Sequence, residues 1–151
     1  MLTLLLTGCG FQLRGTTTVP PEMSQTFIST LDRHSVFYRK LRAELQQAGV
    51  VIVDSPVDAT AVFSILVDVT DQRVISVSAR NVPREYEIYY TINYELNTSE
   101  ATLLEERTQT LTRDYTFDET LVLGKAKEEE VLRDAIADDL VRIVLIQLSS
   151  L

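Results

Sequence analysis

The sequence predicts an α+β fold, a two-layer sandwich in which two helices pack on one face of a mostly antiparallel sheet of about four strands. Two segments have the apolar spacing of amphipathic helices, one at residues 35–48 and one that closes the chain. A third segment, residues 84–97, alternates apolar and polar residues over its whole length. Elements with one apolar face each bury those faces against one another, and helices on a sheet are the simplest arrangement that does so.

The first part of the chain predicts a strand followed by a helix. Residues 26–31 read as a short strand, and Ser35 is the expected N-cap of a helix that runs to about Ala48. Gly49 supplies the C-terminal stop. The apolar stripe of this helix comprises Phe37, Leu41, Leu45 and Ala48. The apolar run at residues 50–53 is compatible with a strand or with a buried connection.

Residues 61–79 predict a second strand-like stretch with one buried face. Its odd positions are expected to point into the core, namely Phe63, Ile65, Val67, Val69, Ile75 and Val77. Asp71 and Arg73 interrupt that face, so we expect a bend or a bulge near them.

The clearest strand is residues 84–97, where six even positions in a row are apolar or aromatic. This pattern predicts one buried face and one polar face. Residues 102–117 give a weaker strand signal, with threonines on the even face and Leu111, Tyr115 and Phe117 on the odd face.

The chain closes with a long helix that is expected to begin between residues 118 and 125. A length of 151 residues predicts one domain. We assign that domain to residues 26–151, a lipidated N-terminus and tether to residues 9–25, and the remnant of a signal peptide to residues 1–8.

Leu-Thr-Gly-Cys at residues 6–9 ends an apolar run that starts at Leu2, which is the arrangement of a bacterial lipobox. In such a motif the thiolate of Cys9 carries a diacylglycerol, and the amino group freed by cleavage is acylated. Because no charged residue precedes it and the run is short, we expect either that the true start codon lies further upstream or that the N-terminus of the sequence has been trimmed. Gly10, rather than Asp, follows the cysteine, which favours the outer membrane. Several acyl chains on one residue give stable anchoring, at about 0.8 kcal/mol per buried methylene.

Composition excludes several classes of function. The net charge of −8 argues against a nucleic-acid binder, and any anionic ligand would need a local basic patch. No catalytic motif or phosphate-binding loop is present. The only histidine, His34, lies in a polar turn before a helix, and the spacing of Asp68 and Asp71 is explained by a strand and a turn. We therefore expect no enzyme, no cofactor and no metal.

The octet Gly-Cys-Gly-Phe-Gln-Leu-Arg-Gly at residues 8–15, followed by Val-Pro at residues 19–20, resembles the start of the lipopolysaccharide (LPS)-assembly lipoprotein family LptE. Similar stretches follow at residues 76–80, 85–86, 94–96, 113–115, 123–125, 128–129 and 138–140. The resemblance implies two helices against a four-stranded sheet and a lipid anchor on the periplasmic side of a Gram-negative outer membrane. It also implies two partners, LPS and the β-barrel LptD in a 1:1 ratio.

The resemblance further implies that Arg80 and Lys125 bind LPS, with Arg84 and Lys127 as weaker candidates. Such side chains would form charge-assisted hydrogen bonds to phosphates or carboxylates. The polar face of the strand at residues 84–97 fits the polar lumen wall of a barrel. Two alternatives stay open: a lipid-anchored scaffold of another envelope complex without LPS contact, and a lipid-anchored enzyme in which His34 takes part.

Overall fold

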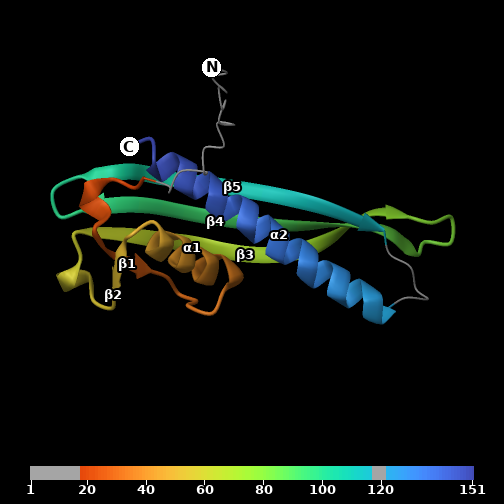
Figure 1. Ribbon diagram of the computed structural model, residues 1–151. Helices are drawn as coiled ribbons and strands as arrows, with labels where there is room; N and C mark the ends of the chain where they lie inside the picture. The colour runs from red at the N-terminus through yellow and green to blue at the C-terminus, as the bar shows by residue number, and fades with distance from the viewer. Residues whose placement is uncertain (1–17, 117–121) are drawn as a thin grey trace, which may run out of the picture.

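The structure, a computed structural model, describes residues 18–116 and 122–151, with only the backbone described for residues 122–125. The elements in chain order are η1 (Pro21–Met23), β1 (Gln25–Ser29), α1 (Val36–Gln47), β2 (Val51–Val53), η2 (Pro56–Asp58), β3 (Ala61–Val77), β4 (Pro83–Thr98), β5 (Thr102–Thr116) and α2 (Val122–Leu148). Both helices lie on one face of a long sheet (Figure 1). The predicted α+β sandwich is therefore confirmed.

The sheet has five strands in the order β2-β1-β3-β4-β5 and is mixed, where the sequence predicted about four mostly antiparallel strands. β1 pairs in parallel with both β2 and β3, whereas β3, β4 and β5 form an antiparallel meander. Parallel neighbours need a crossover, and α1 provides it between β1 and β2. The apolar run after α1 is thus a strand, although only three residues of it pair.

Both ends of α1 are capped as the sequence predicts. The Ser35 side chain accepts a hydrogen bond from the amide of Tyr38 at 3.0 Å. At the other end Gly49 has a φ of 90°, a left-handed conformation that favours glycine. The amides of Gly49 and Val50 donate to the carbonyls of Gln46 and Leu45 at 3.1 and 3.0 Å, which completes a Schellman motif.

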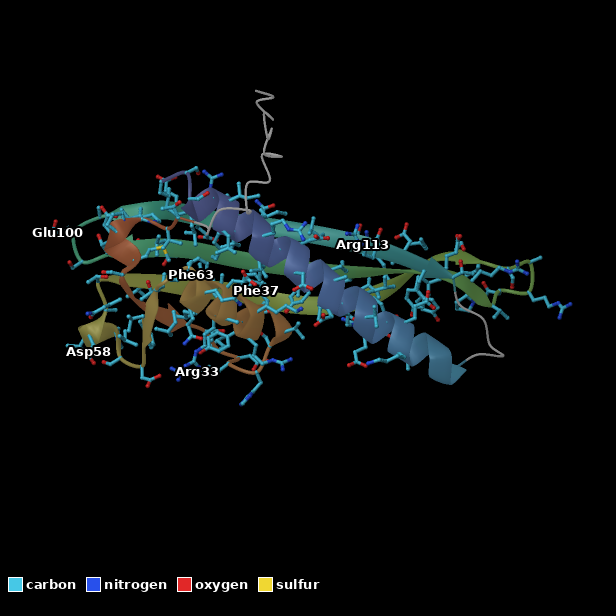
Figure 2. All side chains as sticks on the ribbon, in the orientation of Figure 1. Arg33, Phe37, Asp58, Phe63, Glu100 and Arg113 are labelled. Carbon is cyan, nitrogen blue, oxygen red and sulfur yellow. The ribbon has the colours of Figure 1, made fainter. Side chains whose placement is uncertain are left out.

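The core lies between the helices and the sheet. Phe37 of α1 and Phe63 of β3, both labelled in Figure 2, are fully buried there. The buried residues of α2 are Ile136, Ala137, Leu140, Val141, Val144, Leu145 and Leu148. Ion pairs cross the rim of this layer: the Lys40 ammonium lies 2.9 and 2.6 Å from the carboxylates of Asp134 and Asp138.

The predicted buried face of β3 is right only up to Ile65. The pairing with β4 shifts between Ile65 and Val67, because Leu66 is an extra residue opposite consecutive residues of β4. After this bulge the even positions of β3 face the helices, and Val67 and Val69 are 39% and 50% exposed on the opposite face. Asp71 and Arg73 themselves pair regularly, and the irregularity expected near them lies just after Arg73, where the register shifts between Val74 and Ser76.

Five of the six apolar even positions of β4 are buried as predicted; Ile88, Tyr90, Ile92, Tyr94 and Leu96 are all 1% exposed or less, and Tyr86 is half-buried. On β5, Tyr115 is buried and Leu111 is half-buried, and the threonines at 108, 110 and 112 are exposed. Phe117 lies outside the described residues. In the described part of the chain α2 begins at Val122, within the predicted range of residues 118–125.

Candidate functional site

One face of the sheet carries no helix, and it is here called the open face (Figure 1). The pairing of the strands assigns to it Val67, Val69, Asp71 and Arg73 of β3, Glu87, Tyr89, Thr91, Asn93 and Glu95 of β4, and Glu106, Thr108, Thr110, Thr112 and Asp114 of β5. Most of these side chains are polar, and hydroxyls run along β5. The open face therefore offers hydrogen-bonding groups rather than an apolar surface.

Side chains on the open face bond to one another across the strands. The hydroxyls of Thr91 and Thr110 are 2.9 Å apart. The amide of Asn93 donates to Glu106 at 2.7 Å and to Thr108 at 3.0 Å, while its Oδ1 has no hydrogen-bond partner among the described residues. These cross-strand pairs hold the polar groups in one geometry. The open face is therefore a preorganised surface, which favours binding of a partner.

Arg73 forms a second group on the open face, at the end of β3 that leads to the turn. Its guanidinium forms an ion pair with Glu87 and lies 5.9 Å from the centre of the Tyr89 ring. Arg73 is thus held on the sheet by one carboxylate and one aromatic ring.

β3 and β4 continue past the helices into a hairpin, and residues 74–84 are called the hairpin end (Figure 1). The amide of Ser78 donates to the carbonyl of Val82 at 2.7 Å, and the amide of Asn81 donates back to Ser78 at 2.9 Å. Asn81 has a φ of 60°, a left-handed conformation that asparagine tolerates better than most residues. The turn is therefore a defined structure and not a loose loop.

The structure brings two of the predicted LPS-binding residues together at this turn. Arg80 lies within it and Arg84 lies two residues after it, and both side chains are exposed. Neither has an ion-pair partner within the described part of the chain.

The other predicted basic residues lie at the start of α2, at the same end of the molecule as the hairpin end (Figure 1). Lys125 belongs to the first turn of α2, and its side chain is outside the described part. Lys127 is paired with Glu130 at 2.7 Å, so its charge is partly neutralised on its own helix. The predicted lipidation site, Cys9, also lies outside the described residues.

The described residues do not form a catalytic or metal-binding cluster. His34 is exposed in the turn before α1, where its amide donates to Asp32 at 2.7 Å. Asp68 and Asp71 point to opposite faces of β3. Within residues 18–116 and 122–151, no three His, Cys, Asp or Glu side chains are grouped so that they could hold a metal.

Asp68 has a structural role that the sequence analysis missed. Its carboxylate accepts hydrogen bonds from Ser35 at 2.5 Å and from the hydroxyl of Tyr90 at 2.7 Å. The Tyr90 oxygen in turn accepts from the amide of Phe37 at 3.2 Å. Burial, and next the hydrogen bond to Asp68, raise the pKa of Tyr90 above its ordinary value. This cluster joins the start of α1 to β3 and β4.

Comparison with known proteins identifies relatives over nearly the whole chain. The family model described as "LptE: Lipopolysaccharide-assembly" matches residues 23–148. The LPS-assembly lipoprotein LptE of Yersinia enterocolitica is 31% identical over 149 residues, covering 95% of this chain and 71% of that protein. The described residues contain no helix long and apolar enough to cross a membrane.

Two solved structures of lipoproteins are similar to this chain in fold. An uncharacterized lipoprotein B from Nitrosomonas europaea has a TM-score of 0.77 and 26% identity, covering 94% of this chain and 92% of that chain. The rare lipoprotein B of Shewanella oneidensis has a TM-score of 0.71 at 23% identity, covering 83% of this chain and 94% of that chain, and supports the fold alone.

Proposed function

Because the chain belongs to the LptE family of LPS-assembly lipoproteins, we propose that it is an outer-membrane lipoprotein that plugs the LptD β-barrel and binds LPS. As a member of this family it is an assembly protein and not an enzyme. The observation that carries the proposal is that an open polar sheet face and a basic turn occur together. The turn joins β3 and β4, which are two of the three strands that form the open face.

The anchor in this proposal is Cys9, lipidated and acylated at the periplasmic side of the outer membrane. The lipobox at residues 6–9 and the glycine that follows it support this. Mass spectrometry of the chain purified from envelopes tests it. Recovery of an unmodified thiol at Cys9 would contradict the anchor.

The open face is the proposed contact with the barrel. The lumen wall of such barrels is polar, so a plug needs matching polar groups rather than an apolar patch. The threonine hydroxyls of β5 both donate and accept, so they can pair with donors and with acceptors of the wall.

LPS contact is proposed for Arg80 and Lys125, with Arg84 and Lys127 as weaker candidates. LPS carries phosphates, which a chain of net charge −8 repels on average. The segment from Ser78 to Arg84 contains two arginines and no carboxylate, so the local charge is reversed at the hairpin end. Arginine can hold a phosphate through two parallel hydrogen bonds.

The first experiment is a mild-detergent pull-down from native envelopes through a C-terminal tag. We expect a large β-barrel in about 1:1 ratio that withstands high salt, because the proposed contact relies on hydrogen bonds and shape. Recovery of a different envelope complex, with Cys9 lipidated, would contradict the LptD partnership and favour a scaffold role.

A matched pair of variants tests the open face. Thr110→Arg places a long charged side chain in the middle of that face. Gln46→Arg places the same side chain at an exposed position of α1. We expect the first to lose the barrel in the pull-down and the second to retain it. Equal recovery by both variants would exclude the open face as the contact.

Charge reversal tests the LPS site. Arg80→Asp together with Lys125→Asp should weaken LPS binding at least tenfold and leave the urea unfolding midpoint unchanged, since the Arg80 side chain is exposed. The control is Arg33→Asp, an exposed position near α1 that lies far from the hairpin end in Figure 2. If the control weakens binding as much as the test variant, net charge and not this site governs binding.

A further inference from the structure

The hairpin end exposes aliphatic side chains as well as arginines. Val74, Ile75 and Val77 are 45%, 44% and 54% exposed, although valine and isoleucine in a strand are usually buried on one face. The pairing of β3 with β4 is irregular here, with shifts between Val74 and Ser76 and between Ser76 and Val77. Regular alternation is lost at these shifts, and three apolar residues that are close together in the sequence are exposed to solvent.

The helices do not cover this apolar segment, since the hairpin end projects past both of them (Figure 1). The turn beyond it is fixed by hydrogen bonds from the amides of Ser78, Asn81 and Val82. The carboxylate of Glu85, on the opposite strand, accepts a hydrogen bond from Ser76 at 2.7 Å. Arg80 and Arg84 therefore extend from a preformed turn, a few residues from exposed aliphatic side chains.

Cations next to exposed aliphatic groups match an anionic amphiphile rather than a free anion or a protein surface. A free phosphate gains no binding free energy from Ile75 or Val77. An anionic lipid carries phosphates and acyl chains on one molecule, within about 10 Å of each other, which is the length of three extended residues. Burying the aliphatic side chains against acyl chains removes their apolar surface from water.

We propose that Val74, Ile75 and Val77 contact the acyl chains of the LPS molecule whose phosphates the basic residues hold. This inference rests on the proposed LPS site and adds to it a second, apolar half. The hairpin end then recognises the headgroup through salt-sensitive contacts with Arg80 and the lipid tails through salt-insensitive contacts with the aliphatic segment.

The test compares intact LPS with LPS from which all acyl chains have been removed, using the full chain purified from envelopes. The test variant is Ile75→Thr with Val77→Thr, which keeps branching at Cβ and the strand preference but replaces the ethyl group of Ile75 and one methyl group of Val77 by hydroxyls. The control variant is Val51→Thr with Val57→Thr, exposed valines of β2 and η2 that belong to neither proposed surface.

We expect the parent chain to bind intact LPS at least tenfold more tightly than deacylated LPS. The test variant should lose about tenfold in affinity for intact LPS and keep its affinity for the deacylated form, and the control should change neither. Unchanged binding of intact LPS by the test variant would overturn this inference alone. A parent chain that binds neither form would instead overturn the proposed LPS site. Equal binding to phosphatidylglycerol vesicles and to LPS would also overturn the inference, because it indicates non-specific membrane insertion.

Discussion

Removing the hydroxyl of Tyr90 tests whether the polar cluster under α1 stabilises the fold. Tyr90 is 1% exposed, and Tyr90→Phe keeps its ring in place, so the apolar burial is unchanged. Two interactions are lost: donation to the Asp68 carboxylate at 2.7 Å, and acceptance from the Phe37 amide at 3.2 Å. Both partners lose a hydrogen bond in a buried or half-buried setting.

The expected cost follows from these two bonds. A hydrogen bond to a charged group contributes about 1.5–3 kcal/mol, and a buried amide left without an acceptor costs about 1–3 kcal/mol. Since Ser35 still bonds to Asp68, the two terms are not fully additive, and we expect a loss of about 3 kcal/mol in the free energy of unfolding. With a urea m-value of about 2 kcal/mol per M, the unfolding midpoint falls by about 1.5 M.

Urea unfolding followed by circular dichroism measures this change. The control is Tyr89→Phe, which removes the same hydroxyl from a half-exposed ring on the open face, where it makes no hydrogen bond with the described residues. We expect the control to stay within about 0.5 kcal/mol of the parent. If Tyr90→Phe loses no more than Tyr89→Phe, the cluster does not stabilise the start of α1 and the reasoning is refuted.

Three further predictions concern stability. Burial raises the pKa values of Tyr90, Tyr94 and Tyr115, so these phenols lose their protons at lower pH in the unfolded chain than in the folded one. The free energy of unfolding should therefore be constant below pH ~10 and should fall as the pH rises above it. Urea midpoints measured across that range should fall less steeply in Tyr90→Phe. Gly49→Ala should cost about 1 kcal/mol in thermal unfolding, because its φ of 90° strains any side chain while the space beside it is open; an unchanged midpoint would contradict this. Lys40→Met should lose about 1 kcal/mol at low salt, and the difference should shrink in about 1 M NaCl; a salt-independent loss would indicate packing instead.

The elements that the sequence predicted well are those whose local signal is unbroken. β4 alternates over its whole length and pairs with a strand on each side, so its buried face follows from the pattern alone. α1 carries its own start and stop in Ser35 and Gly49. In both cases the residues that determine the structure are neighbours in the chain.

The parts that the sequence did not predict depend on distant residues. The bulge at Leu66 has no glycine or proline to mark it, and it exists only because β4 supplies one residue opposite two. Everything after it on β3 changes face, which is why the alternation pattern wrongly places Val67 and Val69 in the core and indicates no role for Asp68. The three-residue β2 is likewise too short to recognise without its partner β1.

The same bulge connects the two proposed surfaces. Because β3 changes face at Leu66, the part of the strand beyond it turns Val67 and Val69 toward the open face and then continues, paired with β4, to the hairpin end. A partner that binds the open face therefore also sets the orientation of the hairpin end, because the antiparallel pairing of β3 with β4 runs through both surfaces. Under the proposed function, an open-face variant such as Thr110→Arg should keep its LPS affinity as a purified chain and still fail to support LPS assembly in the cell. A hairpin-end variant should still bind the barrel but should lose its affinity for LPS. A variant at either surface that abolished both activities without unfolding the chain would contradict this separation of the two contacts.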